Sequence, residues 1–308
     1  MKPILVSGAH RTGTTWVGRV LSSSSSVTYI SEPLHLHHSL GVLAAPVHHW
    51  YTYICEENEG AFLDAYQDTV EFRYRTWAAL QDLNSWKELL KMGRDQFLFL
   101  RAGLLNHLPL LKDPFAVFSA PWFSRKLNSR IVICVRHPLA FVSSLKRLGW
   151  SFDFNHLLNQ PLLMRDHLDK FRDRMSSMNT REDDIVGQGI LLWEIIYSVV
   201  AKYKTEVKEC FIVRHEDLSL RPQEGFSALF NQLSLDFTDQ IRRKIMVTTK
   251  RGNPQQLPSG NEHAVQLDSR ANLKNWENRL TLPEVDRILA ATENHLFGFY
   301  EEEEWKTW

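Results

Sequence analysis

Two glycines and two threonines near the start of the chain have the types and spacing of a phosphate-binding loop. Gly8 and Gly13 lie five residues apart, and Thr14 and Thr15 follow directly. The apolar run Pro3–Val6 is typical of a buried strand, and the residues after Gly13 have the apolar spacing of a helix. A strand that leads through such a loop into a helix directs several backbone N–H groups at one point, where the helix dipole is positive. The pattern predicts a site for phosphate or a similar anion.

The loop differs from a nucleoside triphosphate-binding loop at one position. Such a loop has Lys directly after its second glycine, where the side chain contacts the outer phosphates. This chain has Thr14 there, and its nearest cation is Arg11, inside the loop. The difference favours a phosphate ligand other than a common nucleoside triphosphate. A plain turn that uses glycine only for its conformation is the alternative.

A second pair of candidate anion-binding residues follows a later strand. Residues 131–135 are an apolar, β-branched run, and Arg136 stands at its end, before Pro138 at the start of a predicted helix. Ser144 lies eight residues after Arg136, two helical turns along. A guanidinium group binds phosphate with two parallel hydrogen bonds, and a hydroxyl on the same face adds another. A kinase or NTPase would need a magnesium-binding carboxylate where this chain has Arg136, so that class is disfavoured.

Together these motifs resemble those of sulfotransferases that use 3'-phosphoadenosine 5'-phosphosulfate (PAPS). Residues 11–16, Arg-Thr-Gly-Thr-Thr-Trp, are similar to the family's phosphosulfate loop, and Arg136 with Ser144 resembles its 3'-phosphate site. The resemblance implies that backbone N–H groups and threonine hydroxyls hold the 5'-phosphosulfate, while Trp16 stacks on adenine. A basic and aromatic segment near the end adds Arg270. The implied cofactor-binding residues are Arg11, Thr12, Gly13, Thr14, Thr15, Trp16, Arg136, Ser144 and Arg270.

Two carboxylates are candidates for the general base of such a transfer. Glu32 follows the second predicted strand, residues 27–30, at the strand end where open α/β sheets hold their ligands. It resembles a Glu, often followed by Pro, that is the proposed base in carbohydrate sulfotransferases. Asp113 is the rival, in a Lys-Asp-Pro motif similar to that of bacterial members. The resemblance implies that Lys112 stabilises the transferring group and that Arg11 balances charge on the leaving phosphate. A surface or helix-capping role for either acid is the alternative.

Histidines and aromatic rings are concentrated directly after Glu32. Their spacing contains no metal-ligand motif such as His-Glu-x-x-His, so no metal is predicted. Such rings can line a cleft for a small-molecule or glycan acceptor, because they stack on sugar or aromatic faces, and they can equally pack a core. The residues are His35, His37, His38, His48, His49, Trp50, Tyr51 and Tyr53.

The elements that must position these residues alternate along the chain. Strand patterns at residues 3–6, 27–30, 110–112, 131–135 and 210–214 are separated by helical patterns. This alternation predicts an α/β fold with three layers, P-loop-like, with a central mainly parallel sheet and helices on both faces. We expect a single domain over residues 1–308, with a helical insertion at about 60–108 and an acidic tail at residues 301–304.

The composition is that of an ordinary globular protein. Of 308 residues, 44% are hydrophobic and 23% are charged, which suffices for a substantial core. Lys plus Arg equals Asp plus Glu at 36 each, so no global field favours nucleic acid. Cys55, Cys134 and Cys210 are widely spaced and predict free thiols in a reducing compartment such as the cytoplasm. The apolar stretch 189–201 is interrupted by Glu194 and predicts a core helix, so no integral membrane segment is expected.

The sequence therefore predicts a sulfotransferase that moves the sulfuryl group of PAPS in line to a hydroxyl of a carbohydrate, glycolipid or other alcohol, without a metal. A nucleotide kinase or NTPase with an atypical loop is one alternative. A non-catalytic nucleotide-binding protein is the other.

Overall fold

Five strands form one parallel sheet in the computed structural model, which describes residues 2–81, 83, 85–181, 183–256, 266–293, 298–301 and 305. The strands are β1 (Ile4–Gly8), β2 (Val27–Ser31), β3 (Leu108–Lys112), β4 (Arg130–Val135) and β5 (Cys210–Arg214). Their order across the sheet is β2-β3-β1-β4-β5, and every neighbouring pair is parallel. All five carboxyl ends therefore meet at one edge of the sheet.

Helices form most of the connections between the strands. The α-helices are α1 (Thr14–Leu21), α2 (Leu63–Val70), α3 (Thr76–Gln81), α4 (Trp86–Leu104), α5 (Ala120–Lys126), α6 (Pro138–Leu148), α7 (Asn155–Leu158), α8 (Pro161–Leu163), α9 (Arg172–Asn179), α10 (Ile185–Val200), α11 (Tyr203–Glu206), α12 (His215–Leu220), α13 (Pro222–Gln232), α14 (Asp239–Thr249), α15 (Ser269–Leu273) and α16 (Leu282–Thr292). Shorter helical segments are η1 (Glu59–Ala61), η2 (Pro114–Ser119), η3 (Met164–Leu168), η4 (Asp169–Phe171) and η5 (Asn275–Asn278).

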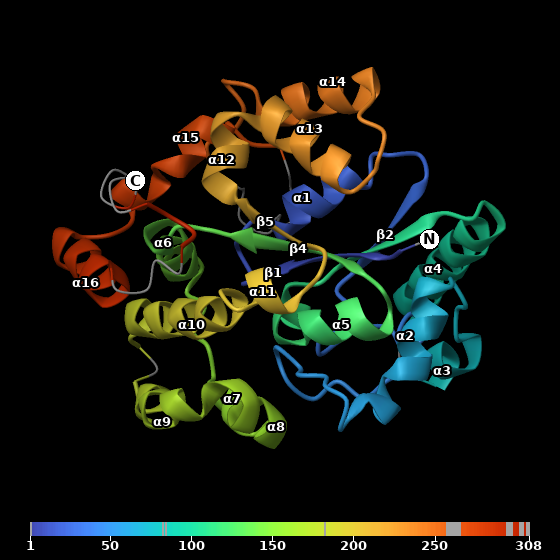
Figure 1. The fold of residues 1–308 in the computed structure, drawn as a ribbon, viewed down its shortest axis with the longest axis horizontal. Helices are drawn as coiled ribbons and strands as arrows, with labels where there is room; N and C mark the ends of the chain where they lie inside the picture. Colours follow the sequence, from blue (N-terminus) through green and yellow to red (C-terminus); the bar gives the residue numbers. More distant parts are fainter. Residues whose placement is uncertain are drawn as a thin grey trace.

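Both faces of the sheet are covered, which confirms the predicted three-layer α/β fold. Successive side chains of a strand point to opposite faces. Ile4 and Val6 of β1 therefore pack with α1, α13 and α14 on one face, whereas Leu5 packs with α5 and α10 on the other. Figure 1 shows these two groups of helices on either side of the strands.

The segment Ile185–Glu206, which contains α10, is a central part of the core. It is long and apolar enough to cross a membrane by length and composition, with a mean hydropathy of 1.4 over its best window. It is also longer than the predicted stretch 189–201. However, 78% of that window is buried inside the protein. Burial of this kind is typical of the core helix of a globular domain.

The residues between β2 and β3 contain α2, α3 and α4, as expected for the predicted helical insertion at about 60–108. These helices lie together at the right-hand side of the molecule (Figure 1). Of the predicted acidic tail, Glu301 is exposed, and residues 302–304 lie outside the described residues.

Candidate active site

The loop from β1 to α1 has the backbone that its two glycines predict. Gly8 has φ +143°, and a Cβ there would lie 2.4 Å from the carbonyl oxygen of Cys134 on β4. Gly13 has φ +94°, and its Cβ would lie 2.8 Å from the His215 ring. Neither position has room for a side chain, because the loop is pressed between its neighbours. The chain enters α1 directly afterwards, so the N-terminal N–H groups of that helix face the loop.

Hydrogen bonds connect the loop to Arg136 and Ser144, the second pair of candidate anion-binding residues. Arg11 has φ +68°, a left-handed conformation that non-glycine residues rarely adopt outside functional sites. Its Nε donates a hydrogen bond to Ser144 Oγ at 3.3 Å, and Arg136 Nη1 donates to the Arg11 carbonyl oxygen at 2.9 Å. Thr12 is buried, and its hydroxyl donates to the Ala9 carbonyl oxygen at 2.6 Å, so this side chain closes the loop. The structure therefore brings together two motifs that are about 125 residues apart.

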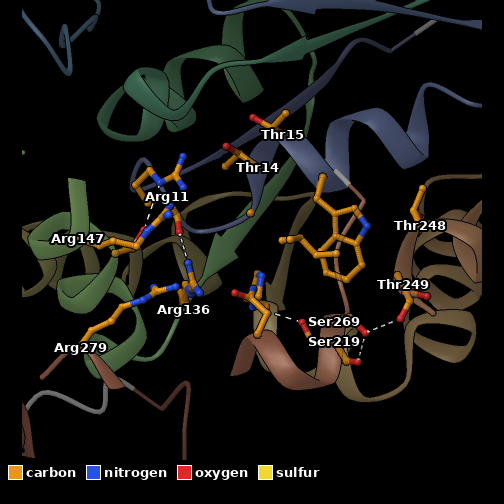
Figure 2. Close-up of a pocket in the computed structure, with 16 residues that line it drawn as sticks. Arg11, Thr14, Thr15, Arg136, Arg147, Ser219, Thr248, Thr249, Ser269 and Arg279 are labelled. Carbon is orange, nitrogen blue, oxygen red and sulfur yellow. Dashed lines mark hydrogen bonds between the residues drawn. The ribbon is translucent and has the colours of Figure 1, made fainter. Parts of the chain in front are cut away.

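A cavity of about 120 Å³ lies beside this loop, and we call it the arginine cavity. Arg11, Arg136, Arg147 and Arg279 gather on one side of it, while hydroxyl-bearing residues lie on the other side (Figure 2). Its described lining contains no Asp or Glu. The described residues of its lining are Arg11, Gly13, Thr14, Thr15, Trp16, Arg136, Ser144, Arg147, His215, Ser219, Thr248, Thr249, Leu267, Ser269, Asn272 and Arg279.

Without a bound anion, the positive charges in the arginine cavity destabilise the folded protein. Burial, followed by repulsion from Arg147, Arg136 and Arg11, lowers the pKa of Arg279 to about 10. Burial also lowers the pKa of Arg136, and Glu216 opposes that effect only in part. A cluster of partly desolvated cations is destabilising until an anion compensates it.

Several buried N–H groups in the same cavity have no hydrogen-bond partner. They are Nε of Arg136, Nε of Arg279 and the indole N–H of Trp16. Buried donors are nearly always paired in folded proteins, so exceptions of this kind call for a ligand or water. Charge and unpaired donors together fit a ligand with more than one anionic group.

The cavity contains residues that sequence analysis missed. Arg147 lies three residues after Ser144 on α6, so helical spacing alone could have identified it. Four other lining residues belong to separate segments of the chain, and nothing in the sequence indicates that they lie together. They are Arg279, Ser219, Thr248 and Thr249. Ser219 and Thr249 are joined through Ser269, whose hydroxyl donates to the Ser219 carbonyl oxygen at 2.8 Å and to the Thr249 carbonyl oxygen at 3.4 Å.

Arg270, by contrast, does not line the arginine cavity. Its side chain is exposed, and its Nη2 donates to the Leu220 carbonyl oxygen at 3.1 Å. Arg279, nine residues later, supplies the guanidinium group from this part of the chain.

Glu32 and Lys112 form an ion pair at the carboxyl ends of β2 and β3. Lys112 is buried, whereas the Glu32 side chain is 19% exposed. Glu32 has φ +48°, so both it and Arg11 are held in the left-handed region. A Cβ on Gly18 would lie 3.1 Å from Lys112 Cγ, which shows that α1 packs directly over the lysine. The tight packing fixes the position at which Lys112 meets Glu32.

Asp113 has a different environment from Glu32. It is buried, and its two carboxylate oxygens accept hydrogen bonds from the backbone N–H groups of Leu34 at 2.6 Å and Phe115 at 2.9 Å. Burial raises the pKa of its carboxyl group to about 7. Both oxygens are thus engaged in holding the loop after Glu32 and in capping η2.

Glu32 opens onto a second, larger space of about 570 Å³, which we call the acceptor groove. His35, His37 and His38 line it on one side, and α4 lines it on the other. Among the described residues, the two linings have no member in common. Helix α1 borders both spaces, because it contributes Thr14–Trp16 to the cavity and Arg19 to the groove.

Not all of the ring-rich segment faces this groove. Tyr51 is buried, and its hydroxyl is hydrogen-bonded to His10 Nδ1 at 2.6 Å. Trp50 packs against Phe115 with ring centroids 4.4 Å apart. The segment therefore contains residues that line the groove and residues that pack inside the protein. Among the described residues, no group of three or more His, Cys, Asp or Glu could hold a metal ion.

Comparison with known structures finds similar folds at low sequence identity. The sulfotransferase domain of the olefin synthase from Synechococcus PCC 7002 is 14% identical, with a TM-score of 0.46 over 95% of each chain. Mouse sulfotransferase SULT7A1 complexed with PAP is 11% identical, with a TM-score of 0.47 over 99% of this chain and 88% of the other. Sulfotransferase STF9 from Mycobacterium avium is 15% identical, with a TM-score of 0.45 over 96% and 76%. Comparison with curated proteins gave no match.

The sequence also matches a family model. The model is described as the sulfotransferase family, and it matches residues 3–239, which include the loop, the Glu32–Lys112 pair and the Arg136–Ser144 pair. This match covers most of the chain and agrees with the resemblance of its motifs. The chain belongs to the sulfotransferase family.

Proposed function

We propose that this sulfotransferase uses PAPS as its donor and transfers the sulfuryl group to a hydroxyl of a carbohydrate, glycolipid or other small alcohol. The observation that carries the donor assignment is the arginine cavity, where four guanidinium groups and the start of α1 converge and where none of the described lining residues is a carboxylate. PAPS has a 3'-phosphate and a 5'-phosphosulfate, so it needs two anion sites beside one adenine site.

The lining offers a distinct group of residues for each part of PAPS. The N–H groups of residues 11–15 and the hydroxyls of Thr14 and Thr15 suit the 5'-phosphosulfate. Arg136, with Ser144, Arg147 and Arg279 beside it, suits the 3'-phosphate. Trp16 also lines the cavity and offers its ring to adenine.

We assign the general base to Glu32 rather than to Asp113. Glu32 is partly exposed in the acceptor groove, whereas both oxygens of Asp113 are engaged by backbone N–H groups. In the reaction, the acceptor oxygen forms a bond to sulfur as the bond from sulfur to the 5'-phosphate oxygen breaks. The acceptor proton goes to Glu32, and the leaving bisphosphate keeps the electron pair, with Arg11 balancing its charge. Lys112 orients Glu32 through their ion pair, and Asp113 positions the loop that follows.

A transfer assay with sulfur-labelled PAPS and a panel of sugars, glycolipids and simple alcohols tests this proposal. Glu32→Gln should lower turnover by about 100-fold or more, because a positioned general base contributes about that factor. Asp113→Asn is the matched control and should keep most of the activity at neutral pH. Full activity of Glu32→Gln would move the base elsewhere, and absence of transfer from PAPS by the wild type to every acceptor would favour a non-catalytic binding protein.

We also propose that residues 1–308 form one domain that works in the cytoplasm. The continuous sheet supports a single domain. A reducing compartment suits Cys55, Cys134 and Cys210, all of which are free.

A further inference from the structure

Helix α4 has an unusual distribution of side chains. It buries only Asp95, Phe99 and Ala102, which lie on one face. The opposite face carries five large apolar side chains that are between 60% and 75% exposed. They are Trp86, Leu90, Phe97, Leu100 and Leu104. Their spacing of three, four or seven residues aligns them in a single stripe along the helix.

Exposed apolar side chains are also present on α3. Trp77 is 83% exposed there, and Leu80 is also exposed. The two helices contact each other and lie at the outer, right-hand side of the molecule (Figure 1). So many large, exposed apolar side chains on two neighbouring helices are uncommon on a monomeric protein and mark a binding site.

A row of cations follows one side of the apolar stripe. Lys87, Lys91, Arg94 and Arg101 are all exposed and lie between the apolar face and the buried face of α4. Arg94 also pairs with Asp95, and the other three lie along the same side. Aromatic and aliphatic side chains beside a row of Lys and Arg are typical of helices that lie flat in the interface of a negatively charged membrane.

We propose that the α3–α4 surface binds peripherally to membranes that contain anionic phospholipids. The apolar stripe would enter the boundary between headgroups and acyl chains, while Lys87, Lys91 and Arg101 contact lipid phosphates. Pairing with a second copy of the chain suits the surface less well. An antiparallel two-fold packing centred at the level of Arg94 would place Arg94 beside Arg94 of the second copy and Lys87 beside its Arg101, so like charges would meet.

The position of the acceptor groove adds a functional consequence. Lys91, Arg94 and Leu98 of α4 also line that groove, opposite Glu32. A membrane bound to α4 would therefore hold the groove near the headgroups, which favours a lipid-anchored hydroxyl as the acceptor. This last step rests on the proposed function, whereas the membrane contact itself does not.

Flotation of the full chain with phospholipid vesicles tests the membrane contact directly. We expect binding to vesicles of phosphatidylcholine mixed with phosphatidylglycerol and much weaker binding to phosphatidylcholine alone. The double variant Leu90→Ser, Phe97→Ser should weaken the partition coefficient by about tenfold or more, because the buried apolar area falls. Lys87→Glu with Arg101→Glu should weaken it by a similar factor, because each cation contributes about fivefold near an anionic surface.

Matched controls lie on other parts of the molecule. Leu282→Ser removes an apolar side chain that is 80% exposed on α16, at the opposite side of the molecule (Figure 1). Arg243→Glu with Lys244→Glu reverses two exposed charges on α14. Both controls should bind vesicles like the wild type, and thermal melts of all variants should show intact folding, since every altered side chain is exposed.

Three results would overturn the proposal: a wild type that does not float with anionic vesicles, α4 variants that float as well as the wild type, and a solution dimer, seen by sedimentation, that the α4 variants dissociate. The last would assign the surface to a second copy of the chain. Because flotation needs neither PAPS nor turnover, its failure would leave the sulfotransferase assignment standing, and binding of 3'-phosphoadenosine 5'-phosphate (PAP) by the same preparation would show this.

Discussion

The arginine cavity and the acceptor groove are both bordered by α1 and are built in opposite ways. The cavity is bounded by strand ends and helix starts, and it includes the buried side chains of Arg136 and Ser144. The groove is bounded by a loop and by α4, whose outer side is exposed along nearly its whole length. One region is fixed by packing on all sides, and the other is open.

This difference indicates that the fold determines the shape of the arginine cavity more closely than that of the acceptor groove. A donor that is the same in every turnover can be held by groups that are rigid before it binds, which lowers the entropy cost of binding. An acceptor has to enter and leave, and variation in loops and exposed helices changes its shape without disturbing the sheet. Substitutions in the two regions should therefore have very different consequences.

The largest effect is expected where the donor loop is pressed against β4. Gly8→Ala would place Cβ 2.4 Å from a backbone carbonyl at a positive φ, so strand and loop would have to move apart. We expect a loss of about 3 kcal/mol or more in the free energy of unfolding, measured by urea denaturation. Gly149→Ala is the matched control, because its φ is +63° but a Cβ there meets nothing within 4 Å. It should cost about 1–2 kcal/mol, and equal losses for the two variants would contradict this account.

A smaller effect is expected within the arginine cavity. Arg279→Gln removes a cation whose Nε has no partner in the protein, so stability should change little while PAP binding weakens. The expected loss is about 1.5–3 kcal/mol of binding free energy, or roughly tenfold to a few hundredfold in affinity. Calorimetric titration measures it. Arg270→Gln is the control outside the cavity and should leave affinity within about twofold. A larger loss of PAP affinity for Arg270→Gln than for Arg279→Gln would show that Arg270, rather than Arg279, contacts the nucleotide.

The smallest effect for a change of one pH unit concerns Asp113. Burial raises its pKa from the ordinary 3.8 to about 7, so the folded state binds a proton more tightly than the unfolded state does. This contribution to stability is fully present below pH 3.8 and is lost as the pH rises through about 7. Denaturation of wild type and Asp113→Asn between pH 4 and pH 7 should give slopes that differ by up to about 1.4 kcal/mol per pH unit. If the free energies of unfolding of the wild type and Asp113→Asn change with pH in parallel between pH 4 and pH 7, Asp113 is ionised throughout that range and the prediction is wrong.

The sequence predicted the fold, and it identified two motifs that the structure brings together around the arginine cavity. Short apolar runs before Gly8 and Arg136 identify strands, and glycine, arginine and serine follow at spacings that local geometry interprets directly. One motif extends from β1 to α1 and the other from the end of β4 into α6, so each is contained within one strand-to-helix unit. Local motifs of this kind depend on backbone conformation that neighbouring residues impose.

The rest of the candidate site depends on how distant segments return to the sheet. Arg279 and Thr249 reach the cavity from the last part of the chain, where spacing carries no information about position. The position of Glu32 in the lining of the acceptor groove and the backbone hydrogen bonds of Asp113 are likewise consequences of packing. The exposed stripe of α4 has the same periodicity as a buried stripe, so the pattern predicts a helix but not which face meets the core.

The most direct test of the donor assignment is calorimetric binding of PAP without magnesium, compared with ATP plus magnesium, for the wild type and Arg136→Ala. The account predicts magnesium-independent PAP binding that Arg136→Ala weakens by at least about tenfold. Glu32→Gln, whose side chain is not among the described residues that line the arginine cavity, should bind PAP like the wild type. Preference for ATP with magnesium, binding of neither nucleotide, or PAP binding that is insensitive to Arg136→Ala would contradict the central claim.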